Sequence, residues 1–149
     1  MKAIAICLFL AACGAPAAQQ DTLQESIIHY NEGIRWERFE AAAAMLPPKE
    51  RAQTVDDWDE RAKDLKITQY DIVKIDSRGT REARVQVKVG WYKASEGTLH
   101  ETHSIQTWER HGKDWQLVEE KRLRGAEMPG LAEPADHEKD HESKRQQKD

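Results

Sequence analysis

The clearest structural signal in this 149-residue chain is the stretch Ala83-Arg84-Val85-Gln86-Val87-Lys88-Val89-Gly90-Trp91-Tyr92. Every second residue from Ala83 to Trp91 is apolar, and polar residues or glycine stand between them. Successive side chains of a β-strand point to opposite faces of a sheet, so this alternation predicts a strand with one buried face. We therefore expect a sheet that packs against other elements on one side.

Three further β-rich segments accompany this strand, at Ile67–Asp76, Leu99–Arg110 and Trp115–Leu123. The segments between the strands are short and contain glycine: Ser77-Arg78-Gly79, Ser95-Glu96-Gly97 and His111-Gly112-Lys113-Asp114. Turns this short join neighbouring strands in antiparallel order. The second half of the chain is thus predicted to be a four-stranded antiparallel meander.

Before residue 65 the apolar residues follow a helical period. The first helix is expected to begin at Asp21 or Thr22, because Thr22-Leu23-Gln24-Glu25 fits a capping box. A second, short helix from Phe39 to Leu46 is stopped by Pro47-Pro48, and a third opens near Pro48 with Trp58 at the centre of its apolar side. The predicted fold class is α+β, with N-terminal helices packed on the meander.

Three helices followed by a four-stranded antiparallel meander resemble the cone-shaped fold of the nuclear transport factor 2-like (SnoaL-like) proteins. The similarity lies in Tyr30–Leu46 with Pro47-Pro48, the run Leu65–Ile72, the strand Val85–Tyr92, and the closing segments Trp108-Glu109-Arg110 and Trp115–Val118. It covers residues 22–124. A plain cystatin-like arrangement, with one long helix on the same meander, is the alternative.

This resemblance implies a pocket between the helices and the sheet. Members of the fold include isomerases, dehydratases, polyketide cyclases and domains without activity. The enzymes among them place an Asp, His or Tyr inside the cone. None of their motifs matches this chain residue by residue, so the resemblance leaves the chemistry of the pocket open.

The first 13 residues have the pattern of a targeting segment: Lys2, the apolar run Ala3–Leu10, and Leu10-Ala11-Ala12-Cys13. The segment resembles the bacterial lipoprotein signal, whose lipobox is a Leu, two small residues and a Cys. The resemblance implies cleavage between Ala12 and Cys13, acylation of Cys13 and a membrane-anchored mature protein in the cell envelope. Gly14, rather than Asp, after the cysteine favours the outer membrane, facing the periplasm. An ordinary secretory leader is the alternative.

Composition narrows the classes of function. The chain is 34% charged and 38% apolar with a net charge of −4, which disfavours a nucleic-acid-binding platform because that needs a concentrated basic face. No stretch after residue 13 approaches the roughly 18 apolar residues that span a bilayer. Cys7 leaves with the leader and Cys13 is acylated, so we expect no cysteine nucleophile, no Cys-ligated metal and no cofactor.

We expect four regions: a signal peptide at 1–12, the lipidated Cys and a tether at 13–21, the cone domain at 22–124, and a charged tail at 125–149. The tail contains no aromatic residue, and Met128 and Leu131 are its only large apolar ones, so it is predicted to be disordered. His137 and His141 in this tail would share a helix face, which is a weak motif for zinc or nickel.

Aromatic side chains are the candidates for lining a cone pocket: Tyr30, Trp58, Trp91 and Trp108. Ordinary core packing is the alternative for them, and the one we favour. The candidates for acid–base chemistry are His29, Tyr30 and Asp71. We favour the interpretation without a catalytic residue. We also expect no metal site, since His100 and His103 are three apart in a strand and point to opposite faces.

Three functions stay open after the sequence alone. The favoured one is a lipid-anchored envelope protein whose non-catalytic cone binds a small apolar ligand or an envelope protein. The second is a small lyase or isomerase that uses an acid–base residue in the cone pocket. The third places the activity in the tail, through contact with the cell wall, a metal or a protein partner.

Overall fold

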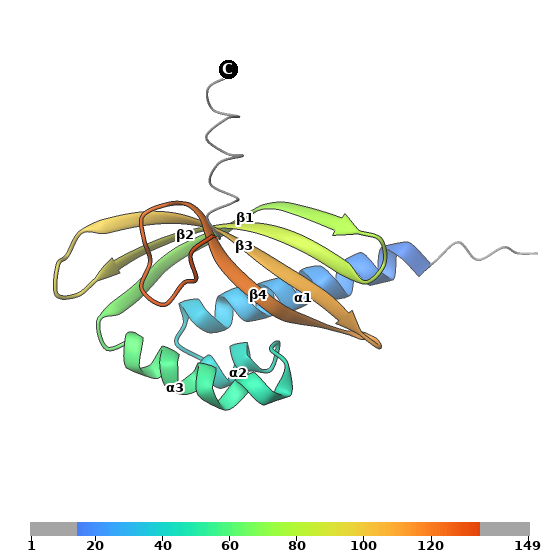
Figure 1. The fold of residues 1–149 in the computed structure, drawn as a ribbon, viewed down its shortest axis with the longest axis horizontal. Coiled ribbons are helices and arrows are strands. Elements are labelled where there is room, and N and C mark those ends of the chain that lie inside the picture. Colours follow the sequence, from blue (N-terminus) through green and yellow to red (C-terminus); the bar gives the residue numbers. More distant parts are fainter. Residues whose placement is uncertain (1–14, 135–149) are drawn as a thin grey trace, which may run out of the picture.

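The computed structural model describes residues 15–134, which form helices packed on one face of a curved sheet (Figure 1). The helices are α1 (Ala15–Arg35), α2 (Phe39–Ala43) and α3 (Arg51–Arg61), with a short 3-10 turn at Pro48–Glu50. The strands are β1 (Leu65–Arg78), β2 (Glu82–Lys93), β3 (Leu99–His111) and β4 (Asp114–Gly125). None of the helices in the described part is both long and apolar enough to cross a membrane.

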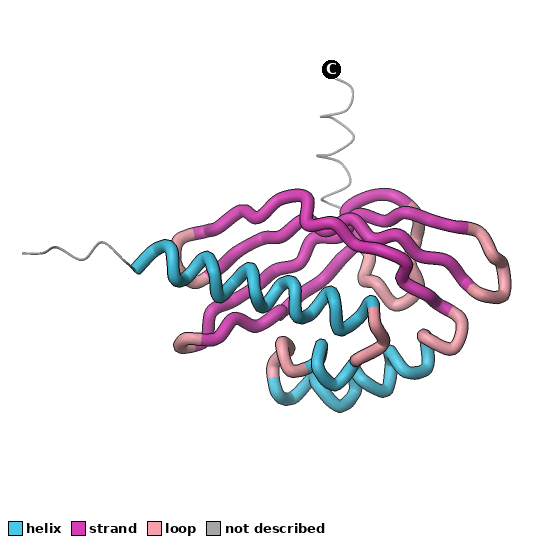
Figure 2. The backbone as a smooth tube through the Cα atoms, turned by 180° about the vertical axis from the view of Figure 1, so that it is seen from behind, coloured by secondary structure: helices cyan, strands magenta, loops and turns pink. Residues whose placement is uncertain are grey.

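The sheet confirms the predicted meander. Its strands lie in the order β1-β2-β3-β4, and each pair of neighbours is antiparallel. Seen from behind, α1 runs along the sheet and α2 and α3 lie further from it (Figure 2). The protein is therefore an α+β cone in which the first helix and the strands enclose the interior.

The core lies between the helices and the concave face of the sheet. From β2 it receives Ala83, Val85 and Val87, which are fully buried, followed by Val89 and Trp91. The facing helices and the turn after α2 supply Leu23, Ile27, Tyr30, Phe39, Ala42, Ala43, Leu46 and Trp58. Within the helical layer, Phe39 of α2 stacks on Trp58 of α3 with ring centroids 5.8 Å apart. The structure thus confirms the prediction from the alternation at residues 83–91, because the apolar side chains of this strand are buried and face the helices.

Two predicted boundaries are wrong. The first concerns α1, which begins at Ala15 rather than at Asp21 or Thr22, so most of the predicted tether at 13–21 is helical. Its residues Ala17-Ala18-Gln19-Gln20 are strong helix formers, and Pro16 falls in the first turn, where a missing N–H costs nothing. Helix propensity over this stretch therefore outweighs the capping signal at Thr22.

The second concerns the segment after β4. Residues 126–134, which we call the strap, are packed on the domain instead of forming part of a disordered tail. Met128 is buried in the core and Leu131 packs against it. Two apolar side chains are too few to predict order from composition, but a groove already formed by the cone can bury them. The rest of the predicted tail, with His137 and His141, lies outside the described residues, as do Ala12 and Cys13.

Candidate functional site

A row of polar side chains lines the inside of the cone along β3. Thr102, Ser104 and Gln106 are buried to within 1% of full burial and alternate with residues on the outer face. They lie on the same face of β3 as Trp108, which is fully buried. The inner face of β3 is therefore polar where that of β2 is aliphatic. Buried polar groups require partners, and these come from α1 and β4.

A β-bulge in the β3–β4 pairing brings a carboxylate into this interior. Trp108 pairs with Leu117, whereas Gln106 pairs with Glu120, so β4 gains one residue between the two pairs. Because side chains alternate along a strand, one extra residue exchanges the faces beyond the bulge. Without it, Glu119 would share the inner face with Leu117. With it, Glu120 points inward, opposite Gln106.

Glu120 is the centre of a hydrogen-bond network. Its Oε1 accepts bonds from Ser104 Oγ at 2.9 Å and from Gln106 Nε2 at 3.0 Å. Its Oε2 accepts a bond from the Tyr30 hydroxyl at 3.1 Å. A carboxylate that enters a core needs such donors to replace water, and here α1 and β3 supply them.

Gln106 connects this network to α1 and to the aromatic core. Its Nε2 also donates to Asn31 Oδ1 at 3.1 Å, and its Oε1 accepts a bond from Trp108 Nε1 at 3.2 Å. Asn31 in turn donates to the Ile27 carbonyl at 2.8 Å. The polar groups of the interior are thus bonded to one another, across α1, β3 and β4.

Tyr30 is held in its neutral form. Burial raises the pKa of the Tyr30 phenol well above 10, and the negative charge of Glu120 together with the hydrogen bond to it raises this pKa further. At neutral pH the phenol is therefore a hydrogen-bond donor, and its proton is directed at Glu120. The Tyr30 and Glu120 oxygens share one proton in this hydrogen bond. Because the Tyr30 hydroxyl donates to Glu120, it is not available to donate to a bound molecule.

Beside this network lies a small cavity of about 20 Å³. Its walls are Tyr30, Asn31, Ile34, Trp58, Ile67, Tyr70, Val89, Glu120 and Met128. A cavity of roughly 10–15 Å³ holds one water molecule, so this one has room for about a single water. The space beside the polar centre is therefore too small for a larger molecule.

The four predicted pocket residues divide into two pairs. Tyr30 and Trp58 are walls of the cavity, whereas Trp91 and Trp108 are not. Trp91 stacks on His100 with centroids 4.5 Å apart and donates from Nε1 to Thr102 Oγ1 at 2.8 Å. Trp108 meets Tyr30 edge to face, with centroids 6.2 Å apart. The structure therefore places one pair at the cavity and the other in the surrounding core.

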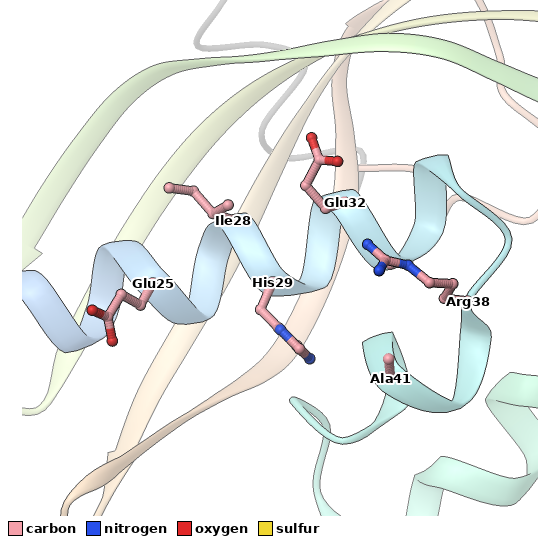
Figure 3. Close-up of a pocket in the computed structure, with 7 residues that line it drawn as sticks. Glu25, Ile28, His29, Glu32, Arg38 and Ala41 are labelled. Carbon is pink, nitrogen blue, oxygen red and sulfur yellow. The ribbon is translucent and has the colours of Figure 1, made fainter.

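The other two acid–base candidates lie outside the cone. Asp71 is exposed and forms a 3.0 Å ion pair with Lys88, its partner in the β1–β2 register. His29 is exposed on α1 and lines a surface groove of about 280 Å³ between α1 and α2. In Figure 3 the His29 side chain projects from the opposite side of α1 to Ile28 and Glu32. Neither His29 nor Asp71 can act on anything bound inside the cone.

Some residues of this polar interior could have been predicted from the sequence. Thr102, Ser104 and Gln106 occupy every second position before Trp108, so the inner row of β3 could have been identified by parity. Glu120 could not, because the parity of Trp115 and Leu117 assigns it to the outside. Among residues 15–134, no group of three or more His, Cys, Asp or Glu side chains is arranged to hold a metal ion.

Comparisons with known proteins bear on the fold. No protein-family model matches the chain, and no curated protein is similar to it in sequence. Several solved structures do match. A ketosteroid isomerase-like protein from Erwinia carotovora atroseptica has a TM-score of 0.57 at 10% identity, over 70% of this chain and 95% of that one.

Two further structures show the same similarity. One is described as a candidate scytalone dehydratase from Novosphingobium aromaticivorans, with a TM-score of 0.57 at 13% identity over 80% of this chain and 95% of that one. The other is a SEC-C motif-containing protein from Rhodopseudomonas palustris, with a TM-score of 0.57 at 9% identity over 72% and 91%. At these identities the likeness concerns the fold alone, which is a nuclear transport factor 2-like α+β cone.

Proposed function

We propose that this chain is a lipid-anchored protein of the bacterial cell envelope whose cone domain binds a small apolar ligand or an envelope protein without catalysing a reaction. The observation that carries the non-catalytic part is the small size of the interior cavity. In the conformation that the structure describes, a cavity of about 20 Å³ has no room for a substrate beside Tyr30 and Glu120.

The hydrogen bonds of Glu120 support the same conclusion. A general base must lie within about 2.6–3.2 Å of the proton that it removes. Both carboxylate oxygens of Glu120 already accept bonds from Tyr30, Ser104 and Gln106. The arrangement is that of a structural polar core, in which each group stabilises its neighbours.

A lyase or isomerase is the competing proposal. The feature that favours it is the presence of an ionisable carboxylate beside a phenol on the cavity wall. Two of the structures with this fold are named for ketosteroid isomerase and scytalone dehydratase. Fold likeness at this level does not transfer an activity, so the choice depends on a direct assay.

Turnover assays separate the two proposals. We expect the purified protein to give no ketosteroid isomerisation and no scytalone dehydration above the uncatalysed rate, as followed by ultraviolet absorbance. The matched variants are Glu120→Gln, in the interior, and Glu119→Gln, its exposed neighbour on β4. A rate that Glu120→Gln abolishes and Glu119→Gln retains would overturn the non-catalytic proposal.

Support for the anchor comes from the lipobox Leu10-Ala11-Ala12-Cys13. Because α1 begins at Ala15, the folded domain would lie directly beside an acylated Cys13 and not at the end of a flexible tether. The outer membrane, on the periplasmic side, is the proposed location, because Gly14 follows the cysteine.

Fatty-acid labelling tests the anchor, and the second cysteine provides the control. Labelled palmitate should enter the wild-type protein and the Cys7→Ser variant, because Cys7 lies in the apolar part of the leader. It should be absent from Cys13→Ser. Equal labelling of Cys13→Ser and wild type would show that Cys13 is not the acylated residue.

A further inference from the structure

The strap, residues 126–134, forms one wall of the cone. It follows β4 and is the orange-red segment that turns back beside the sheet in Figure 1. Met128 is 7% exposed and lines the cavity together with Tyr30, Trp58 and Glu120. Its side chain therefore forms part of the wall between the polar centre of the cone and the surface.

The near end of the strap is fixed inside the domain. The amide of Ala126 donates to the Glu101 carbonyl at 3.0 Å, and the Ala126 carbonyl accepts a 2.6 Å bond from Thr102 Oγ1. Gly125 precedes this anchor with φ +88°, and a Cβ there would lie 2.6 Å from the Glu101 carbonyl oxygen. The chain thus turns at Gly125 in a conformation that other residues rarely adopt.

The far end is held differently, by an ion pair near the surface. Arg122 Nε donates to both carboxylate oxygens of Glu133, at 2.8 and 2.9 Å, and Arg122 Nη2 also contacts this carboxylate. The backbone joins the same two segments, because the Arg122 amide donates to the Ala132 carbonyl at 2.7 Å. The Glu133 side chain is 44% exposed, so solvent and salt have access to this contact.

The interior network does not depend on the strap. The bonds of Glu120 to Tyr30, Ser104 and Gln106 are all made among α1, β3 and β4. If Met128 moved out, these groups would keep their partners, and the space that it leaves would join the cavity. Movement of the strap would therefore expose the Glu120 network without breaking its hydrogen bonds.

We propose that the strap is a lid on the cone, with its pivot at Gly125–Ala126 and its latch at Arg122–Glu133. Opening releases the latch, withdraws Met128 and enlarges both the cavity and its access to solvent. The lid controls access to the interior, and the proposal holds whether the interior only binds a molecule or also transforms it.

A lid predicts how the affinity of an interior probe should change. The apparent affinity of a protein for such a probe is reduced by the fraction of molecules that are open. Weakening the latch raises that fraction and must raise the apparent affinity in the same proportion. The chain offers a matched pair of substitutions, because Glu127 also lies on the strap but is 83% exposed and 3.8 Å from Arg122.

The experiment uses residues 13–149 with Ser in place of Cys13, since the buried core residues that the structure describes run from Leu23 to Met128. The probe is 1-naphthol, a flat apolar molecule with one hydroxyl, and its binding is followed by fluorescence. Glu133→Gln should bind it about tenfold more tightly than the parent protein, for a tenfold rise in the open fraction. Glu127→Gln removes the same charge from the same strap and should bind like the parent.

A second measurement weakens the latch with salt. Salt at 1 M shortens the screening length to about 3 Å and should raise naphthol affinity in the parent protein more than in Glu133→Gln, which has no latch to screen. Hydrogen exchange of the Arg122 amide should be faster in Glu133→Gln.

Equal naphthol affinity in the parent and both variants would overturn the lid. Turnover in the assays above would instead overturn the non-catalytic function and leave the lid standing.

Discussion

The Tyr30 hydroxyl donates a 3.1 Å hydrogen bond to Oε2 of Glu120, which lies 90 residues further along the chain. This bond joins the first helix to the last strand through the middle of the cone. Ser104 and Gln106 donate from β3 to the other carboxylate oxygen, Oε1. The Glu120 network is therefore formed by tertiary contacts among α1, β3 and β4. Breaking its hydrogen bonds should lower the free energy of unfolding.

Glu120→Gln is the most conservative test of that centre. The amide keeps the size of the side chain but has one carbonyl oxygen, and its NH₂ group cannot accept the Tyr30 proton. A buried polar group left without its partner costs about 1–3 kcal/mol. Urea denaturation should show a loss in this range. An unchanged unfolding midpoint would show that the network does not stabilise the fold.

Alkaline pH should destabilise the protein through its tyrosines. Burial, aided by Glu120, raises the pKa of folded Tyr30 well above the value near 10 that an unfolded chain has. The folded state then keeps a proton that the unfolded state has lost, so the free energy of unfolding falls as pH rises above about 10. Below that pH the contribution of Tyr30 is fully present.

Tyr70 should contribute in the same direction, because burial, helped by a hydrogen bond to Glu32, raises its pKa to about 12. Its share of the loss falls between about pH 10 and 12. Unfolding by urea at a series of pH values checks both residues. The slope should be shallower in Tyr30→Phe and in Tyr70→Phe than in the parent, and an equal slope in Tyr30→Phe would contradict the burial of that phenol.

Trp91→Ala should cost about 3–5 kcal/mol, because it removes a large buried side chain and leaves a cavity. Trp91 is 3% exposed, stacks on His100 and donates to Thr102. Trp36→Ala is the matched control, since Trp36 is 59% exposed and such surface changes usually stay within about 0.5 kcal/mol. A loss below about 1 kcal/mol for Trp91→Ala would show that this indole is not part of the core.

Gly33→Ala tests the contact between α1 and α2. Alanine is favoured over glycine inside a helix by about 1 kcal/mol, so propensity alone predicts a gain in stability. A Cβ at residue 33, however, would lie 2.8 Å from Ala42 Cβ and 3.0 Å from the Ala42 backbone nitrogen. Backbone cannot give way cheaply, so we expect a net loss of about 1–3 kcal/mol in urea denaturation. A rise in stability would mean that the two helices can separate freely.

The sequence by itself determined the layers of this protein. The alternation at residues 83–91 and the helical spacing of Leu23, Ile27 and Tyr30 each depend on local geometry, which decides which side chains share a face. The short turns after β1, β2 and β3 left antiparallel neighbours as the simplest pairing. Fold class, strand order and most of the apolar core follow from these local rules.

Only the tertiary structure decided what lies at the centre of the cone and what covers it. Glu120 faces inward because of a bulge in the β3–β4 pairing, and a register shift depends on two strands at once, so the pattern of β4 alone assigns this residue to the wrong face. Met128 is buried because the cone offers it a groove, although the composition around it predicts disorder. Both depend on contacts between segments distant in sequence, whose free energy has no counterpart in the local pattern.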